Sequence, residues 1–139
     1  MFTLCHLYYI YCSYLPEPHE KISVCVCADT PLFFWINSEP AFHGVGQVPV
    51  PLAMAPGVLK HDSFADLSGV KMFAEKDLKR ARPFGVISNE LRQLLLGALA
   101  AGNRMLPEAR RQMAAEALTV PAANSPSNPG SQEPPSQQQ

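Results

Sequence analysis

Short stretches of apolar residues, separated by prolines and turn residues, dominate the first part of the chain. Residues 4–14 are rich in Tyr, Leu and Ile and contain no Gly or Pro, which is typical of a β-strand. In residues 21–28 apolar side chains alternate with Ser and Cys, so one face of this strand is expected to be apolar. Residues 32–37 are again strongly β-prone, and the short turn before them predicts a hairpin.

The middle of the chain predicts weaker strands. Residues 38–46 form a loop, and residues 47–54 alternate Val with Pro, which favours an edge strand because proline lacks a backbone donor. Residues 60–67 and 69–74 predict either a further pair of strands or one long bent strand. The charged residues 75–82 indicate one helical turn.

Residues 88–101 carry the clearest helical pattern. Ser88 can cap the first turn with its hydroxyl group, and Glu90 lies where the helix dipole favours a negative charge. A buried face is predicted by apolar residues at helical spacing, namely Leu91, Leu94, Leu95, Ala98 and Leu99. Gly102 is well placed to end the helix. A second, weaker helix is predicted over residues 107–118, with proline at its first position.

These elements predict one domain over residues 1–118 and a disordered tail over residues 119–139. The tail is dominated by Pro, Ser, Asn and Gln and cannot bury enough apolar area to offset the entropy cost of ordering. The expected fold class is α+β, mainly β: a small SH3-like barrel with an amphipathic helix packed against it. An α/β arrangement is disfavoured because the early strands lie too close together for helical crossovers.

The composition bounds the partners and the compartment. The chain has 139 residues, 47% of them hydrophobic, and a net charge of −1, so no strong overall field attracts nucleic acid and RNA binding needs a local patch. The apolar residues 1–15 have no Lys or Arg ahead of them, no cleavage-site pattern and too little length to span a bilayer. We therefore expect a cytoplasmic protein without membrane association, whose cysteines are reduced thiols.

The cysteines offer an alternative metal site. Zinc needs four ligands at tetrahedral spacing, and the candidates are the pair Cys25 and Cys27 together with Cys5 and Cys12. A Cys-x-Cys pair in a strand places both sulfur atoms on one face, which suits core packing equally well. Packing is the favoured interpretation, and a small zinc protein stays an alternative.

His61 is the strongest candidate for acid–base chemistry. It lies in the segment Lys60-His61-Asp62-Ser63, and in a strand His61 and Ser63 share one face. A histidine and a lysine near a hydroxyl group can move protons and neutralise charge at a phosphodiester. His19 is a weaker candidate of the same kind. The competing interpretation is a solvated strand edge with ordinary polar residues.

Two further stretches have both a structural and a functional interpretation. The cations of residues 76–82, Lys79 and Arg80 among them, could contact phosphates, but the interleaved acidic residues favour a solvated turn. The consecutive aromatic residues 33–35 project to both faces of a strand. One side is core, and the other is either a dimer face or a base-stacking surface, with core on both sides as the default. The sequence shows no Gly-rich phosphate loop and no dinucleotide signature.

Residues 63–99 resemble the last part of the PemK/MazF-like toxins. In that family a strand of the form D-L-S-x-V-[RK] is followed by a charged turn, and a G-x-[LIV]-S step then leads into a closing amphipathic helix. The corresponding segments here are residues 66–71, 75–82 and 85–88. Their order and spacing agree with the family pattern, and the first half of the chain agrees in outline.

The resemblance implies an SH3-like barrel that forms a homodimer and acts as a metal-independent endoribonuclease without a cofactor. It implies single-stranded RNA as substrate, the RNA 2′-hydroxyl as nucleophile, and a cognate antitoxin protein that blocks the RNA groove. The chain departs from the family pattern in three places. Lys21 and Ile22 stand where the family has Arg-Pro, and residues 50–54 lack the usual Thr or Ser. Lys71 replaces a later Arg, and lysine cannot hold a phosphate through two planar contacts.

Two hypotheses follow from these residues. In the first, His61 is the general acid or base of an endoribonuclease, and Ser63 positions the phosphate. Lys21 and Lys71 neutralise its charge. RNA contacts are then assigned to His19, Lys60, Lys79 and Arg80. In the rival hypothesis the chain is a non-catalytic barrel-type interaction module of a phage or mobile element, and residues 33–35 and the helix form its protein-binding surface.

Overall fold

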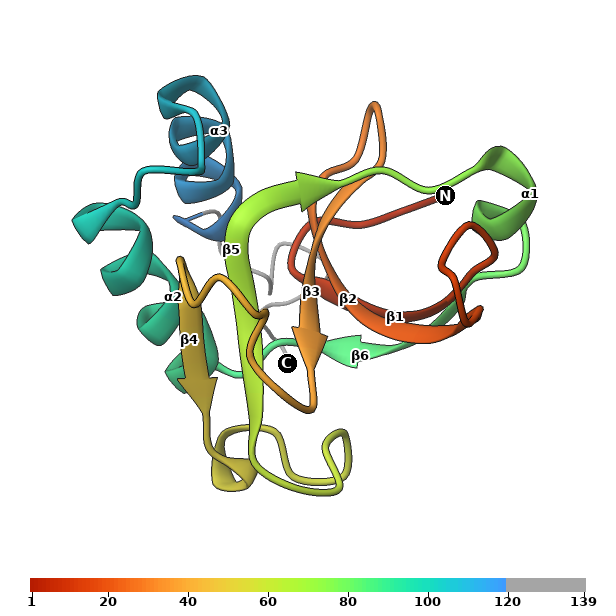
Figure 1. Ribbon diagram of the computed structural model, residues 1–139, viewed down its shortest axis with the longest axis horizontal. Helices are drawn as coiled ribbons and strands as arrows, with labels where there is room; N and C mark the ends of the chain where they lie inside the picture. Colours follow the sequence, from red (N-terminus) through yellow and green to blue (C-terminus); the bar gives the residue numbers. More distant parts are fainter. Residues whose placement is uncertain (120–139) are drawn as a thin grey trace, which may run out of the picture.

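The computed structural model of the protein describes residues 1–119 and shows one antiparallel sheet flanked by helices (Figure 1). The strands are β1 (His6–Cys12), β2 (His19–Cys27), β3 (Leu32–Asn37), β4 (Gln47–Val50), β5 (Ser63–Lys71) and β6 (Arg82–Val86). The helices are the 3-10 turn η1 (Leu52–Met54), α1 (Glu75–Leu78), α2 (Asn89–Ala101) and α3 (Glu108–Thr119). The tail predicted to be disordered lies outside the described residues, except that Thr119 ends α3.

The strand order is β4-β5-β3-β2-β1-β6, and every neighbouring pair is antiparallel. The predicted α+β class is confirmed, and so is the hairpin of β2 and β3. The strand predicted over residues 47–54 is confirmed as an edge strand but ends at Val50, where η1 follows. Short loops join β1 to β2 and β2 to β3, because antiparallel strands need no crossover helix between them, whereas β3–β5 and β1–β6 are pairs of strands that are distant in the chain.

The sheet is open, so the SH3-like barrel expected from the sequence is not closed. Its edges are β4 and β6, which do not pair with each other. Each edge strand contains a proline, Pro49 or Pro83, and each proline removes a backbone N–H donor from the ladder. Helix α2 follows β6 in the chain and contacts β4, so a helix rather than strand pairing spans the gap (Figure 1).

Both faces of the sheet are covered by apolar residues. One face packs with α2 and α3 into the helix-side core, which includes Val24, Val26 and Phe34. The opposite face carries a smaller outer core that consists of Tyr8, Ile10, Cys12, Cys25, Phe33 and Phe73. The alternation predicted for β2 is therefore confirmed for Val24 and Cys25, which lie in different cores. It fails at Cys27, which packs against the helix-side core after a register shift, so Cys25 and Cys27 do not share a face. Most side chains of β2 are apolar because one face of the strand packs in the helix-side core and the other face packs in the outer core.

Helix α2 matches its prediction closely. The Ser88 hydroxyl accepts a hydrogen bond of 3.0 Å from the backbone N–H of Leu91, as expected of a cap. Leu91, Leu95 and Leu99 are buried in the helix-side core. Gly102 ends the helix with a φ of 71°, a conformation that favours glycine. Helix α3 confirms the weaker predicted helix and packs on α2.

No helix within residues 1–119 is both long and apolar enough to cross a membrane.

Strand β6 was not expected from the sequence. Pro83 and Gly85 are poor strand formers, and the strand exists because β1 supplies its pairing partners, with Tyr9 opposite Arg82. Of the two alternatives predicted for residues 60–74, a single bent strand is the correct one, and it begins at Ser63. The helical turn predicted within residues 75–82 is confirmed as α1.

Candidate functional site

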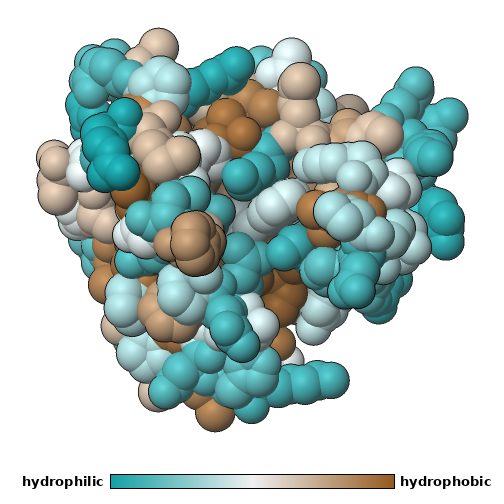
Figure 2. Space-filling model, in the orientation of Figure 1, coloured by the Kyte–Doolittle hydropathy of each residue, from teal (hydrophilic) through white to brown (hydrophobic). Residues whose placement is uncertain are grey.

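A cavity of about 790 Å³ opens at the end of the sheet where β2, β5 and β6 begin and β3 ends. Its wall contains most of the residues singled out from the sequence, namely His19, Lys21, Lys60, His61 and Ser63. Figure 2 shows the hollow in the lower part of this face, with apolar side chains at its base and hydrophilic residues around it. Ile22 and Ile36 are among the apolar lining residues. The cavity thus combines an apolar floor with a polar rim, whose charged residues are Lys21, Lys60, Arg82, Glu20 and Glu39.

His61 and Ser63 lie side by side at the start of β5. The Nδ1 atom of His61 is 2.9 Å from the carbonyl oxygen of Asp62 and 3.4 Å from the Oγ atom of Ser63. Because a carbonyl oxygen can only accept, Nδ1 carries the hydrogen there, and Nε2 is the ring nitrogen that remains for a ligand. Ser63 donates to the His61 carbonyl oxygen at 3.1 Å and is almost completely buried. Ser63 therefore orients His61 and is not exposed as a nucleophile.

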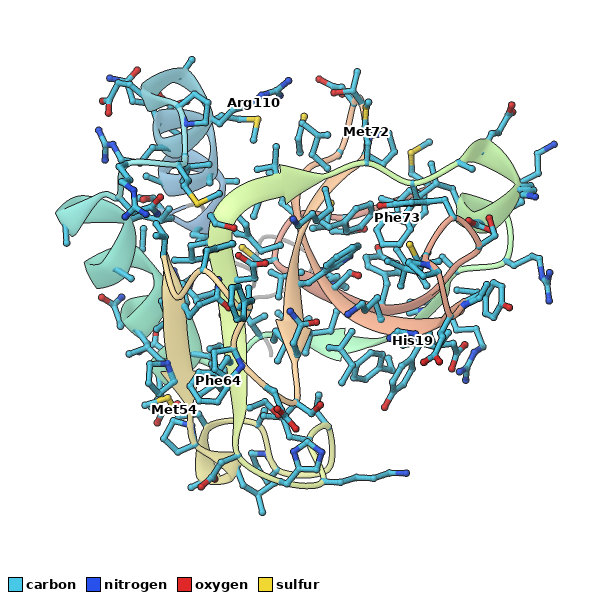
Figure 3. The ribbon with its side chains drawn as sticks, viewed as in Figure 1. His19, Met54, Phe64, Met72, Phe73 and Arg110 are labelled. Carbon is cyan, nitrogen blue, oxygen red and sulfur yellow. The ribbon has the colours of Figure 1, made fainter. Side chains whose placement is uncertain are left out.

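His19 begins β2 and is exposed at the rim of the cavity (Figure 3). Its Nδ1 atom is 2.7 Å from the carbonyl oxygen of Glu17. The same argument as for His61 places the hydrogen on Nδ1 and leaves Nε2 available to solvent or a ligand. Two imidazole groups, each with Nδ1 held by a backbone carbonyl oxygen, therefore line one cavity.

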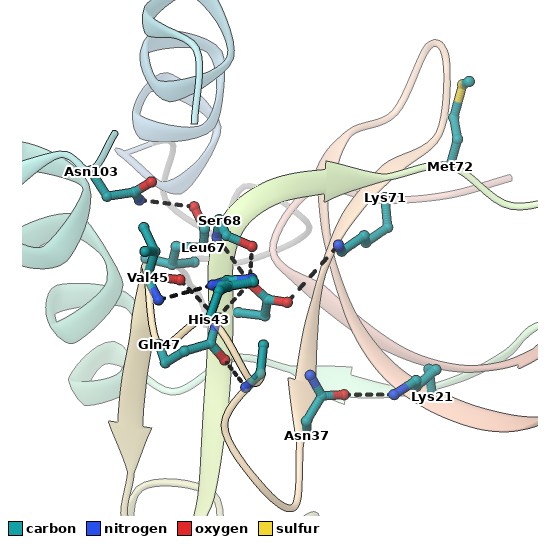
Figure 4. A network of polar contacts seen from close by, with 12 residues as sticks. Lys21, Asn37, His43, Val45, Gln47, Leu67, Ser68, Lys71, Met72 and Asn103 are labelled. Atoms are coloured by element: carbon teal, nitrogen blue, oxygen red, sulfur yellow. Dashed lines mark hydrogen bonds and ion pairs between the residues drawn. The ribbon is translucent and has the colours of Figure 1, made fainter. Parts of the chain in front are cut away.

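Lys21 lines the cavity, and its ammonium group is held by Asn37, whose Oδ1 atom accepts a hydrogen bond of 2.8 Å (Figure 4). The ammonium nitrogen lies 4.6 Å from the centre of the Trp35 ring, a favourable cation–π arrangement. Burial lowers the pKa of Lys21, and Lys71 adds a smaller repulsion in the same direction, while Asp66 opposes it. Lys21 is thus a partly desolvated cation at the cavity wall.

Lys71 does not join the cavity, although it approaches the same tryptophan. Its ammonium nitrogen lies 4.8 Å from the centre of the Trp35 ring and 3.9 Å from Oδ2 of Asp66. The register explains the separation. Ser63 pairs with Val50 of the helix-side core, whereas Lys71 pairs with Phe33 of the outer core, and a register shift lies between them. Lys21 pairs with Ile10 and so shares the outer face with Lys71, but it lies near the start of β2, where the cavity opens. The expected convergence of Lys71 with His61 is therefore not found.

The acidic residue beside Lys71 has a structural role. Asp66 is buried, and its Oδ1 atom accepts hydrogen bonds from the backbone N–H of Ser68 at 2.9 Å, from the Ser68 hydroxyl at 2.6 Å and from Gln47 Nε2 at 2.9 Å (Figure 4). Burial alone would raise the pKa of Asp66, but these hydrogen bonds and the charge of Lys71 together lower it. The Asp-Leu-Ser motif of residues 66–68 thus stabilises the bend of β5 and the start of β4.

Lys79 and Arg80 lie at the end of α1, away from the cavity (Figure 1). Lys79 is 4.0 Å from Glu75 on an exposed surface, and Arg80 lies over Tyr11 at 5.9 Å from the ring centre. Both residues lie in a solvated turn, which is the alternative interpretation given for this charged segment. They share no groove with His61.

Arg82 is a cavity residue that no sequence pattern indicates. Its Nη2 atom contacts both carboxylate oxygens of Glu20, at 2.7 and 2.8 Å, and its guanidinium group lies 4.9 Å from the centre of the Tyr9 ring. Tyr9 in turn stacks on Phe84 with ring centres 4.0 Å apart. Recognition of β6 as the partner of β1 would have placed Arg82 opposite Tyr9.

The aromatic residues 33–35 are core on both faces. Phe33 and Phe34 are fully buried in different cores, and Trp35 is partly buried with an Nε1 atom that has no hydrogen-bond partner within residues 1–119. The surface that the rival hypothesis assigns to this strand is therefore covered by the protein itself.

The cysteines do not form a cluster suited to a metal. All four are free thiols, three of them buried, and no group of three or more His, Cys, Asp and Glu side chains within the described part of the chain could hold a metal ion. Cys12 and Cys25 pack in the outer core, and Cys5 packs in the helix-side core. The zinc alternative finds no support there.

The resemblance noted in residues 63–99 rests on their motifs and stays a prediction. Comparison with protein-family models and with curated proteins returned no match for this chain.

Proposed function

We propose that this chain is a divergent relative of the PemK/MazF-like toxins, a cytoplasmic, metal-independent endoribonuclease that cuts single-stranded RNA. The observation that carries the proposal is the position of the residues chosen for their chemistry, since one cavity is lined by His19, Lys21, Lys60, His61 and Ser63. In this proposal the open sheet is an unclosed form of the SH3-like barrel. The protein acts as a homodimer, and a cognate antitoxin is its protein partner.

The reaction requires a base, an acid and a positive charge near the phosphate. The RNA 2′-hydroxyl attacks the adjacent phosphorus atom, so that the O2′–P bond forms while the P–O5′ bond breaks. The products are a 2′,3′-cyclic phosphate and a 5′-hydroxyl. The 2′-hydroxyl proton passes to Nε2 of His61. The leaving 5′-oxygen takes a proton from a second acid, for which His19 on the same cavity is our choice, and this role requires His19 in its doubly protonated form, with a hydrogen on Nε2 as well as on Nδ1.

Lys21 supplies the positive charge. A partly buried ammonium group is screened less by water and salt than an exposed one, so it stabilises the charge that develops on the phosphate more strongly. Lys60 lies on the exposed rim and extends the positive surface for the RNA backbone. Ser63 acts on the orientation of His61 rather than on the phosphate, because its side chain is buried.

The test is cleavage of a long single-stranded RNA by the purified chain, with the new 5′ ends mapped by sequencing. We expect cleavage that persists in excess chelator, and a loss of about 100-fold or more for His61→Ala, the usual size of a general acid–base contribution. His43→Ala is the matched control, because His43 lies in the loop before β4 and does not line the cavity. Intact RNA with the unaltered protein, or equal losses for the two variants, contradicts the proposal.

A further inference from the structure

Arg82 and Glu20 form an ion pair on the wall of the cavity. Both residues line it, and one terminal nitrogen of Arg82 lies within 2.8 Å of both carboxylate oxygens of Glu20. A guanidinium group recognises the oxygens of a phosphate with the same planar set of donors that it uses for a carboxylate. Glu20 therefore occupies the position on Arg82 that a phosphate group would take.

The guanidinium group is held from a second direction by aromatic rings. It lies over Tyr9, and Tyr9 stacks on Phe84. Arginine keeps a favourable contact with an aromatic face whatever its other partner is. Arg82 therefore stays at the cavity wall when Glu20 moves away, and no large rearrangement is needed to present it to a ligand.

Glu20 is easily displaced. The side chains of Arg82 and Glu20 are 60% and 44% exposed, so water and salt compensate most of the attraction between them. Separation of the two groups therefore costs little. An RNA strand places several phosphates near the cations of the same cavity. The contacts of its other phosphates can offset the free energy needed to separate Arg82 from Glu20.

We infer that Arg82 is the guanidinium group that holds an RNA phosphate in this cavity, and that Glu20 masks it while RNA is absent. The inference rests on the proposed function, because it takes the cavity to be an RNA site. Arg82 supplies from β6 the planar contact that lysine at positions 21 and 71 cannot make. Glu20 is then an internal competitor that lowers affinity for a single stray phosphate.

The experiment measures binding with a probe that cannot be cut, a single-stranded RNA oligonucleotide with a 2′-O-methyl group on every ribose. Its affinity for the full chain is measured by fluorescence anisotropy with Glu20→Gln and with Glu39→Gln. Glu39 is the matched control, because it lines the same cavity and makes no ion pair among the described residues. Each variant removes one negative charge, but only the first releases Arg82. We expect E20Q to bind the probe about threefold to tenfold more tightly than E39Q.

The same pair of substitutions is then compared in an Arg82→Gln background. We expect the two double variants to bind with equal affinity, because the group that Glu20 masks is gone. Equal affinity of E20Q and E39Q in the unaltered background overturns the inference, and so does an E20Q advantage that persists without Arg82. Failure of every variant to bind the probe overturns it as well. Thermal unfolding of each variant checks that it is folded.

The two proposals fail in different experiments. A protein that cuts RNA but binds the probe equally well as E20Q and as E39Q retains the proposed activity and loses the role of Arg82. A protein that shows the E20Q advantage but leaves RNA intact has an RNA-binding cavity without the proposed cleavage.

Discussion

The hydroxyl group of Ser88 donates a hydrogen bond of 2.8 Å to the carbonyl oxygen of Met54. The same oxygen atom of Ser88 accepts the hydrogen bond that caps α2. Met54 ends η1, which follows the edge strand β4, and Ser88 follows β6, the opposite edge of the sheet. One side chain thus begins the helix and connects the two edges that strand pairing leaves apart.

Substitution of this residue is expected to weaken the fold measurably. Ser88→Ala removes both hydrogen bonds, and we expect the free energy of unfolding to fall by about 1–2 kcal/mol, the usual cost of a lost cap. Ser88→Asp keeps the acceptor for Leu91 but cannot donate to Met54, so its loss is smaller. Urea unfolding followed by circular dichroism measures both. Equal losses for the two variants would show that the cap contributes nothing.

Two glycines of the loop before β4 provide a matched pair. Gly44 and Gly46 have φ values of 72° and 68°, so alanine is strained at either position. At Gly44 a Cβ atom meets open space, whereas at Gly46 it lies 2.8 Å from the backbone nitrogen of Ser68. We expect Gly44→Ala to cost about 1–2 kcal/mol of unfolding free energy and Gly46→Ala distinctly more, measured by urea unfolding. A Gly46 variant as stable as the Gly44 variant disproves the close approach.

Asp66 makes the stability depend on pH. Its folded-state pKa is lowered below 3.8, because the hydrogen bonds and Lys71 outweigh the opposing effect of burial. The folded state therefore binds fewer protons than the unfolded state in this range. The stabilisation is complete above the unfolded pKa of about 3.9 and is lost as the pH falls through the folded pKa.

Asp66→Asn isolates this contribution. We expect the variant to lose about 1–3 kcal/mol of unfolding free energy at pH 7, because an amide replaces a carboxylate that accepts three hydrogen bonds. The difference from the unaltered protein should shrink as the pH falls through the folded-state pKa of Asp66, because the carboxylate itself is then protonated. Urea titrations at a series of pH values measure the difference, and a gap that stays constant with pH rules out the assigned role.

The two lysines beside Trp35 should differ in RNA binding. Lys21 lines the cavity and Lys71 does not, so Lys21→Gln should weaken binding of the uncleavable RNA more than Lys71→Gln. Lys21→Gln should also make the plot of log affinity against log salt concentration less steep, with the magnitude of its slope reduced by about 0.7. This is the value for one lost phosphate contact on a single strand, about 0.7. Anisotropy titrations over a range of salt concentrations measure both. A larger effect of Lys71 would place the RNA site outside the cavity.

The first strands and α2 could be predicted because their own residues carry the pattern. The alternation around Val24 and the spacing of Leu91, Leu95 and Leu99 are local properties that follow from one buried stripe. Strand β6 has no such pattern, since Pro83 and Gly85 oppose it and only the neighbouring strand makes it form. Whether a sheet is open or closed depends on whether its two edge strands pair with each other. The periodicity of apolar residues carries no information about that pairing.

The site residues can also be divided into those that follow from local sequence and those that depend on distant strands. His61 and Ser63 are neighbours in sequence, so their contact follows from strand geometry, and the turn before β5 brings Lys60 with them. Lys71 was misplaced because the register shift in β5 moves it to the other face, and such a shift is visible only in the pairing with β3. Arg82 was missed because its contacts come from β1 and β2, distant parts of the chain.

The prolines of the two border strands have a consequence for the behaviour of the protein at high concentration. An open sheet presents unpaired N–H and C=O groups that can recruit the sheet of another molecule and start a fibre. Pro49 and Pro83 interrupt that row at both borders, while β1, β2, β3 and β5 contain no proline. The prolines thus weaken both borders as templates for another sheet, and we expect a stable association with a second copy to use side chains rather than shared strands.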